Sequence, residues 1–419
     1  MKAFNSIGAR VTFDCRFCPN INITEIADLG LQPIANNFRL PAQNEREYYF
    51  PLLVGFCPNC FLVQLVEQPA PEQMFHGEYK FFSQTSQKMI KHFEETSKAL
   101  FQEFASGSDD SGVLEIGSND GIFLQNLVND AKRLVGIDPS TNVSKVAKNK
   151  GIEIVDDFFG SDSSLSVIDR YGKFDLVFAA NVICHIPDIR DLMIGIKNVL
   201  KSGGTFVFEE PYLGDMISNN SYDQIYDEHV YIFSANAIKI IAHEFDLTLF
   251  RCEKLWTHGG SMRYFLSANK SITVEESVKE TIQDEFRLGL RNSNTLQLSG
   301  TNFLAQAQAL KQLLEEFKLS KKKIVGYGAT SKSTTILNYA QIGPELISYI
   351  ADTTPQKQGR LSPGMSIPIV SFDFFYADQP DYVLLFAWNH KQEIFEKENL
   401  KGNKFKWIIP FPMPSIVEL

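Results

Sequence analysis

Short apolar runs alternate with helix-like segments through the middle of the chain, and this alternation constrains the fold more than any other feature. Each run is rich in Val, Ile, Leu and Phe and is short enough to be one buried strand. The runs occupy residues 112–118, 133–140, 152–158, 174–182 and 205–211. A helix is predicted between the last two runs, ending at Gly203. Strands that alternate with helices predict an α/β fold with a doubly wound, mostly parallel sheet.

The chain has 419 residues, more than one hydrophobic core usually organises, so two or three domains are expected. We place them at residues 1–75, 76–270 and 271–419. The first contains short apolar runs between Pro and Asn turns, as in small β-rich modules. The second begins with a polar helix. The third begins with a helical bridge and continues with a strand, a Gly turn and a helix, which predicts a second Rossmann-like unit. These segments are 50–56, 60–69, 86–104, 272–319 and 322–340, and further strands are expected within 345–354, 381–389 and 404–411.

Charge and hydropathy exclude some classes of partner. The net charge is −10, and the longest basic run is the triplet 321–323. Binding to the phosphate backbone of a nucleic acid is therefore not expected. No apolar stretch approaches the roughly 20 residues that cross a bilayer, and the N-terminus lacks an apolar signal segment. We expect a cytoplasmic protein with no membrane partner, either a monomer or a homodimer.

Four of the six cysteines form two C-x-x-C pairs, Cys15 with Cys18 and Cys57 with Cys60. In a cytoplasmic protein such pairs indicate a metal before they indicate disulfides. Two thiolates on each of two tight turns can complete a tetrahedron around Zn²⁺, and a full ligand set makes the site structural. The alternative is that these are buried thiols. Cys184 and Cys252 are expected in the core.

A Gly-containing turn follows the first strand of the middle part, in the segment L-E-I-G-S-N-D-G. Gly117 ends the strand and Gly121 is predicted to start a helix, so a ligand could approach the backbone there and face the helix N-terminus. Asp138 ends the following strand, where a carboxylate can accept both hydroxyls of a ribose. The segment is not G-x-G-x-x-G, which favours a nucleoside without phosphates over a dinucleotide. Glycines that serve only helix–strand packing are the alternative.

Several motifs together resemble those of the deoxysugar C-methyltransferases, which use S-adenosylmethionine and methylate C3 of a nucleotide-linked 4-keto sugar. The motifs are the paired C-x-x-C, E-I-G-S-N-D-G at 115–121, G-I-D-P at 136–139, Y-D-E-H-V-Y-x-F-S at 226–234, H-G-G-S-M-R at 258–263 and G-Y-G-A-T-S-K at 326–332. The resemblance covers essentially the whole chain. It implies a zinc-binding β module, a class I methyltransferase Rossmann-like domain and a C-terminal Rossmann-like domain.

The resemblance also implies which residues bind S-adenosylmethionine. Asp138 would bind the ribose, and Asn181 would lie beside the methionine part. Asp157 and Phe158 would flank the adenine, although Asp157 could also be a plain surface carboxylate. The remaining cofactor residues are Glu115, Gly117, Ser118, Asn119, Asp120 and Gly121.

The Y-D-E-H segment offers acid–base groups for C-methylation. A carbon next to a ketone must lose a proton before it attacks a sulfonium methyl group, so a base and a donor to the enolate oxygen are needed. We predict His229 as the base, Glu228 as the group that orients its ring or tunes its basicity, and Tyr226 as the donor. The alternative is an aromatic entry to the helix that Ser234 caps.

Further polar residues match positions that the family uses near the sugar. Tyr79 and His185 could be acid–base groups or donors to the sugar, or, alternatively, packing residues. His258 and Arg263 could support the substrate, although a strand with a Gly bend explains the neighbouring glycines equally well. His76, His92, His243 and His390 belong to no motif.

The G-Y-G-A-T-S-K turn of the third part resembles a nicotinamide site only superficially, because Ser331 replaces the third glycine of that fingerprint. The family resemblance instead implies a role in holding the diphosphate of a dTDP- or GDP-linked sugar. The residues would be Gly328, Ser331, Lys332 and Thr334. A domain that only packs or dimerises is the alternative.

We therefore expect an S-adenosylmethionine-dependent C-methyltransferase of branched-sugar biosynthesis. Three other functions compete with it: O- or N-methylation of another small metabolite, non-enzymatic nucleotide binding, and a nicotinamide-dependent dehydrogenase built on the third part.

Overall fold

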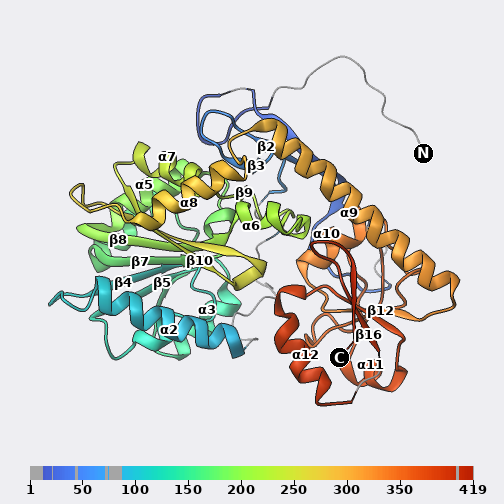
Figure 1. Ribbon diagram of the computed structural model, residues 1–419. Coiled ribbons are helices and arrows are strands. Elements are labelled where there is room, and N and C mark those ends of the chain that lie inside the picture. The colour runs from blue at the N-terminus through green and yellow to red at the C-terminus, as the bar shows by residue number, and fades with distance from the viewer. Residues whose placement is uncertain are drawn as a thin grey trace.

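The computed structural model describes residues 13–20, 22–42, 46–70, 74, 87–402 and 405–418. Tyr79, predicted near the sugar, and His76 lie outside these residues. Three sheets organise the described chain, with four, seven and six strands, and each belongs to a different part of the molecule (Figure 1). The fold is α/β, as the alternation of apolar runs predicts.

The seven-stranded sheet forms the central part, in the order β10-β11-β8-β7-β4-β5-β6. All five predicted strands are present and are mutually parallel, and β11 runs antiparallel between β8 and β10. The strands are β4 (Gly112–Ile116), β5 (Arg133–Ile137), β6 (Glu153–Val155), β7 (Phe174–Ala180), β8 (Leu200–Pro211), β10 (Thr248–Leu255) and β11 (Ser261–Ser267).

The predicted end of the helix before β8 is wrong by one turn. The helix α5 (Ile189–Val199) ends at Val199, not at Gly203. Leu200 already pairs with Phe174 of β7, so the strand begins there. Gly204 lies so close to β7 that a Cβ would come within 2.9 Å of the Phe174 carbonyl oxygen. The glycine therefore serves a close approach between strands and does not cap the helix.

Helices cover both faces of the central sheet, and a separate hydrophobic cluster lies under each set. One set comprises α2 (Gln87–Phe104), the 3-10 turn η2 (Leu124–Leu127) and α3 (Thr141–Asn149). The other comprises α4 (Ser161–Tyr171), α5, α7 (Ala235–Glu244) and α8 (Glu276–Arg287). The predicted cap of α7 is confirmed, because the Ser234 hydroxyl accepts a hydrogen bond from the Ala237 N–H.

The N-terminal sheet is antiparallel, in the order β1-β2-β3-β9. Its first three strands are β1 (Thr24–Pro33), β2 (Tyr49–Phe56) and β3 (Val63–Leu65), whereas β9 (Tyr231–Ile232) comes from the segment after Y-D-E-H. The long helix α9 (Ser293–Leu319) runs along β1 (Figure 1). Gly300 permits this packing, since a Cβ there would lie 1.9 Å from the Ile26 carbonyl oxygen.

The C-terminal sheet has the order β14-β13-β12-β15-β16-β17, and its pairs are parallel except β16–β17. The predicted second Rossmann-like unit is therefore present. Its elements are β12 (Ile324–Tyr327), α10 (Ser331–Tyr339), β13 (Ile350–Ala351), β14 (Ile369–Val370), α11 (Phe372–Asp378), β15 (Tyr382–Leu385), α12 (Lys391–Asn399), β16 (Lys406–Ile409) and β17 (Ser415–Val417).

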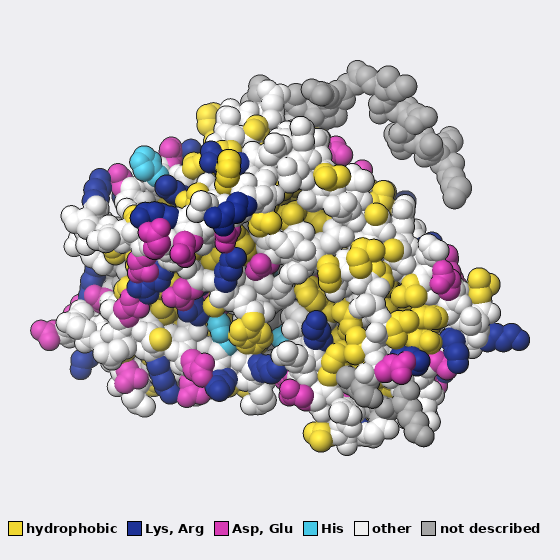
Figure 2. Space-filling view, viewed as in Figure 1, with side chains coloured by type: hydrophobic (Ala, Val, Ile, Leu, Met, Phe, Trp, Pro, Cys, Tyr) yellow, Lys and Arg dark blue, Asp and Glu magenta, His cyan; other side chains and the backbone are white. Residues whose placement is uncertain are grey.

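The visible surface differs between the two halves of the molecule. Charged side chains of both signs cover the central part, whereas hydrophobic side chains gather over the C-terminal half (Figure 2). Exposed Leu298, Leu304 and Leu319 of α9 belong to that half. Among the described residues, no helix is both long enough and apolar enough to cross a membrane.

Candidate functional site

A cavity of about 1320 Å³ lies where the three parts of the molecule meet. The carboxyl ends of β4, β5 and β7 open into it, as expected for ligand sites of open α/β sheets. The N-terminal part adds Ile34, Asn36 and Asn37, and the C-terminal part adds the turn before α10 and the loop after β13. Residues that are distant in the sequence therefore share one enclosed space.

Gly117 and Asp138 define one end of the cavity. Gly117 has φ +68°, and a Cβ there would lie 2.3 Å from the Val182 side chain, so the turn requires glycine. Two backbone N–H groups hold the Asp138 carboxylate: Asn119 N donates to Oδ2 (2.9 Å) and Ser140 N donates to Oδ1 (2.8 Å). The fixed carboxylate faces the cavity and can accept hydrogen bonds from a ribose.

Other residues predicted to bind the cofactor divide into two groups. Asp157, half-exposed Phe158 and Asn181 line the cavity together with Gly117, Asn119 and Asp138. The buried Asn181 Oδ1 accepts no hydrogen bond from any residue that the structure describes, so it can accept one from the ammonium group of a bound methionine moiety. Because a carboxylate, an aromatic side chain and an amide oxygen offer complementary contacts to a ribose, an adenine and an ammonium group, these residues fit S-adenosylmethionine. The second group lies behind the cavity wall: Glu115, Ser118, Asp120 and Gly121.

The residues behind the wall support the turn. Glu115 is buried, and burial together with Asp120 and Asp138 raises its pKa well above the usual range. A Cβ on Gly121 would lie 2.6 Å from the Ile152 side chain, so this glycine permits close packing. The packing explanation, left open from the sequence, applies to Gly121.

The four cysteines of the two C-x-x-C pairs gather into one cluster. The sulfur atoms of Cys15 and Cys60 are 3.6 Å apart, those of Cys18 and Cys57 are 3.4 Å apart, and all four lie within 4.8 Å of one another. Tetrahedral Zn²⁺ with bonds of about 2.3 Å would separate its sulfur ligands by about 3.8 Å. The four thiols fit a structural zinc ion.

His229 lies in a tight turn whose backbone closes from His229 N to Tyr226 O (3.0 Å). Its Nδ1 is 2.7 Å from the Gln224 carbonyl oxygen, and its Nε2 is 2.7 Å from the Tyr226 hydroxyl. A carbonyl can only accept, so Nδ1 carries the proton and Nε2 accepts from Tyr226. Burial is the main reason that the pKa of His229 lies well below 6.5. The ring is therefore neutral near pH 7. The cavity therefore contains a neutral imidazole with its lone pair next to a phenol.

The predicted orienting role of Glu228 is wrong, because its carboxylate does not hold the imidazole. Its Oε1 accepts a hydrogen bond from Asn36 Nδ2 (2.6 Å), and the Gln224 carbonyl holds the His229 ring instead. Glu228 still lines the cavity. Burial and the neighbouring Asp227 raise its pKa well above the usual range. A protonated Glu228 is thus a potential hydrogen-bond donor.

His185 lies beside the predicted base, with its ring centroid 5.3 Å from that of His229. Burial lowers its pKa to about 4. It ends the 3-10 turn η3 (Ile183–His185), which buried Glu210 holds by accepting from three successive N–H groups, those of Val182, Ile183 and Cys184. Cys184 and Cys252 are buried, as predicted.

The residues predicted to contact substrate also fall into two groups. His258, Ser331 and Lys332 line the cavity, whereas Gly328, Thr334 and Arg263 do not. Arg263 is engaged elsewhere: its guanidinium donates to Glu209 Oε1 (2.7 Å) and to Glu253 Oε2 (2.9 Å). The interpretation of Arg263 as a substrate residue therefore lacks geometric support.

Thr334 and Lys332 bind other parts of the chain. The Thr334 hydroxyl donates to the Ala35 carbonyl (2.8 Å), so it joins α10 to the N-terminal part. The buried Lys332 ammonium donates to the His258 carbonyl (2.7 Å). Burial lowers the pKa of Lys332, and Asp223 opposes that shift.

Several cavity residues carry no sequence motif and were missed. They are Asn36, Lys357 and His390. Asn36 lies in a loop of the N-terminal part that only the tertiary fold brings to Glu228. Lys357 is half-buried and donates to the Ala329 carbonyl (2.7 Å). No local pattern could have identified these three side chains, since only the tertiary fold brings their loops to one cavity.

Comparisons with known proteins match all three parts. Residues 15–75 match a family described as a zinc binding domain, residues 89–251 one described as a methyltransferase domain, and residues 256–412 one described as a C-methyltransferase C-terminal domain. The chain is 30% identical over 409 residues to C-methyltransferase NovU of Streptomyces niveus, covering 96% of each chain.

Solved structures of methyltransferases are also similar, at low identity. One, from Thermotoga maritima, is 16% identical and has a TM-score of 0.33, over 43% of this chain and 89% of that chain. Another, from Clostridium acetobutylicum, is 16% identical with a TM-score of 0.34, over 43% and 92%. With NovU matched along almost its whole length, the chain belongs to the family of S-adenosylmethionine-dependent C-methyltransferases that combine a zinc-binding domain, a methyltransferase domain and a C-methyltransferase C-terminal domain.

Proposed function

We propose that this C-methyltransferase methylates C3 of a nucleotide-diphosphate-linked 4-keto deoxysugar, in the biosynthesis of a branched sugar. The observation that carries the proposal is the neutral imidazole of His229 next to the Tyr226 hydroxyl, in the same cavity as the residues that fit S-adenosylmethionine. Methyl transfer to oxygen or nitrogen needs no carbon acid to be deprotonated. A buried base and an adjacent donor are what enolate formation requires.

His229 and Tyr226 would act on neighbouring atoms of the substrate. In the structure the Tyr226 hydroxyl donates to His229 Nε2. In the reaction this hydroxyl turns to the ketone oxygen and donates there as negative charge develops, and the freed Nε2 takes the proton from the adjacent C3. The Nδ1–H bond to the Gln224 carbonyl keeps the lone pair on Nε2 and stabilises the imidazolium that forms. S-adenosylmethionine, when bound, supplies the electrophilic methyl group. Protonated Glu228 can donate to another oxygen of the sugar.

The C-terminal part of the cavity suits a diphosphate. Two ammonium groups, those of buried Lys332 and half-buried Lys357, lie near the N-terminus of α10, where Ser331 also lines the cavity. A helix N-terminus and cations both stabilise phosphate oxygens. Because this end and the cofactor end border one cavity, a sugar nucleotide can bind with its sugar near His229.

The experiment that tests the proposal has two arms. The enzyme is incubated with labelled S-adenosylmethionine and dTDP- or GDP-linked 4-keto sugars, and carbon NMR locates the new methyl group. In the second arm the donor is omitted and deuterium from the solvent is followed into C3. We expect label on C3 and exchange of the C3 proton. Methyl transfer to oxygen or nitrogen without exchange would overturn the proposal and favour the O- or N-methyltransferase alternative.

A further inference from the structure

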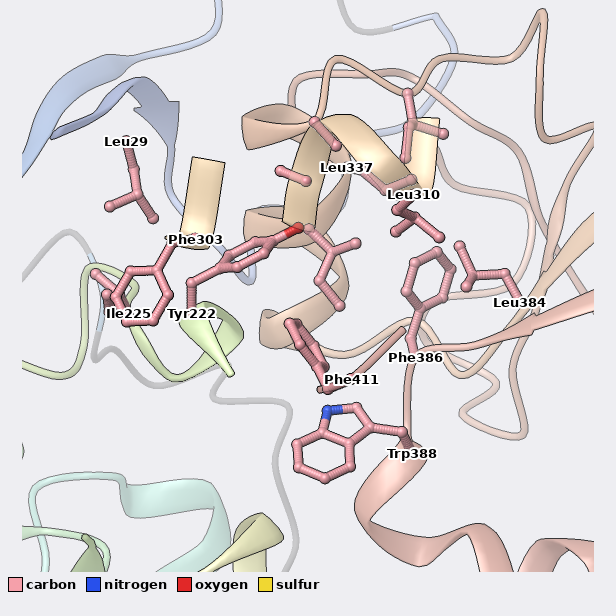
Figure 3. Close-up of a cluster of buried hydrophobic side chains, with 14 of the residues drawn as sticks. Leu29, Tyr222, Ile225, Phe303, Leu310, Leu337, Leu384, Phe386, Trp388 and Phe411 are labelled. Carbon is pink, nitrogen blue, oxygen red and sulfur yellow. The ribbon is translucent and has the colours of Figure 1, made fainter. Parts of the chain in front are cut away.

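The segment that carries His229 is anchored in the C-terminal domain as well as in its own. It begins with the 3-10 turn η4 (Tyr222–Gln224). The rings of Tyr222 and Phe411 have centroids 5.2 Å apart, and Trp388 packs on Phe411 at 5.4 Å. Figure 3 shows Tyr222 and Ile225 within the cluster that also contains Leu337 and Leu384 of the C-terminal sheet domain. The apolar end of the segment is therefore part of the C-terminal core.

Two buried hydrogen bonds also fix the orientation of this segment. The Thr335 hydroxyl on α10 donates to the Ile225 carbonyl (2.8 Å). The Trp388 indole N–H donates to Asp223 Oδ2 (2.7 Å). Trp388 begins the 3-10 turn η6 (Trp388–His390), which precedes α12. Buried hydrogen bonds of this kind fix orientation, because breaking one leaves a polar group without a partner.

These two bonds bracket Gln224, the residue whose carbonyl holds the base. Asp223 precedes it and Ile225 follows it, so the C-terminal domain holds the residues on both sides, Asp223 through its side-chain carboxylate and Ile225 through its backbone carbonyl. The Gln224 side chain also donates to the His258 carbonyl, to which Lys332 Nζ donates as well. The direction of the Gln224 carbonyl determines which nitrogen of His229 keeps its proton.

We infer that Thr335 and Trp388 are positioning residues for the base: through them, the C-terminal domain fixes the Gln224 carbonyl and thereby the tautomer and orientation of the His229 ring. This inference rests on the function proposed above for His229. It gives the C-terminal domain a role beyond binding substrate. Docking of that domain becomes a condition for deprotonation, whereas the cofactor residues at β4 and β5 do not depend on it.

The test uses the full chain with Thr335→Val, which removes one hydroxyl at nearly constant volume, and Trp388→Phe as a second variant. We expect about a tenfold fall in C3 deuterium exchange and in kcat for Thr335→Val, with the Kd for S-adenosylmethionine within twofold of wild type. Thr335→Ser should restore most of the activity. Tyr376→Phe is the matched control, because the Tyr376 hydroxyl donates to Glu398 in the same domain, away from this segment.

A second readout needs no substrate and separates this inference from the proposed function. Nitrogen-15 NMR of labelled histidine, with His229→Gln to identify the signal, reports the tautomer of His229. We expect one tautomer, protonated at Nδ1, in the wild type and a mixture of tautomers in Thr335→Val. If the wild type shows no exchange, the proposed function fails while the NMR result still decides the positioning role. An unchanged tautomer with exchange within twofold of wild type would overturn the inference.

Discussion

The two ends of the cavity are built in different ways. At the cofactor end, Gly117, Asn119 and Asp138 come from consecutive strand–turn units of one sheet, and local backbone bonds hold them. At the base end, His229 lies on an irregular segment held by three domains. The N-terminal domain contacts this segment twice: Ala35 N donates to Asp227 Oδ1 (2.9 Å), and Asn36 donates to Glu228. The C-terminal domain contacts it through the hydroxyl of Thr335.

This difference suggests that the two ends can be disabled separately. A change at the cofactor end should weaken binding of the methyl donor and leave proton exchange intact. A change at the base end should do the reverse. Because contacts that are distant from one another act independently, single substitutions can distinguish the two ends cleanly.

The largest effect is expected from His229→Gln, which removes the base and keeps a neutral polar side chain. General base catalysis contributes roughly 10²–10⁴-fold, so C3 exchange and methyl transfer should fall by that factor. Calorimetry should find the affinity for S-adenosylmethionine unchanged. The control is His243→Gln, which alters an exposed histidine on α7. A variant at His229 that retains exchange within tenfold of wild type would assign the base elsewhere.

Substitution of the zinc ligand Cys60 should have the next largest effect, on zinc content and on the stability of the fold. The N-terminal part that contains this site also contacts the segment that carries His229. Cys60→Ser is expected to eliminate stoichiometric zinc and to lower the free energy of unfolding by on the order of 3 kcal/mol. That is less than the roughly 10–16 kcal/mol of isolated zinc-finger peptides, since packing against the central part remains. Metal analysis and the denaturant midpoint measure both effects.

Cys252→Ser provides the comparison for the zinc prediction, because Cys252 is a buried thiol outside the cluster. The Cys252→Ser variant should still bind one zinc ion per chain. If Cys60→Ser also retained one zinc ion per chain, the four-thiolate site would be wrong.

Sequence reasoning succeeded where structure is local. The five parallel strands and the Ser234 cap follow from patterns within a few residues, and the structure contains them. It failed where contacts are distant. The pairing of β9 with β3 depends on the tertiary fold. The hydrogen bond from His229 to the Gln224 carbonyl spans only five residues, but it depends on the irregular path of this segment, which no sequence pattern specifies. Proximity along the chain suggested Glu228 as the orienting group, yet the turn aims its carboxylate at Asn36.

At the cofactor end, Asp138→Asn should weaken S-adenosylmethionine binding by roughly 10–100-fold, the range for a lost hydrogen bond to a charged group. Exchange of the C3 proton without the donor should stay within twofold of wild type. Asp156→Asn is the control, since Asp156 is a neighbouring carboxylate that pairs with Lys148 on the surface. Equal losses of affinity and exchange would show that the two ends are not separable.

The smallest expected effect is on the pH dependence of C3 exchange. It tests whether burial lowers the pKa of His229. A free imidazole with pKa near 6.5 would lose roughly threefold of its neutral form between pH 7 and pH 6. Burial lowers the pKa of His229, so its neutral form persists to lower pH and the acid limb of the exchange rate moves to lower pH. We expect less than a twofold fall in exchange over that interval, with S-adenosylmethionine affinity measured at each pH to verify folding. A midpoint near 6.5 would mean that burial does not lower the pKa of His229, and the explanation of its neutral form by burial would be wrong.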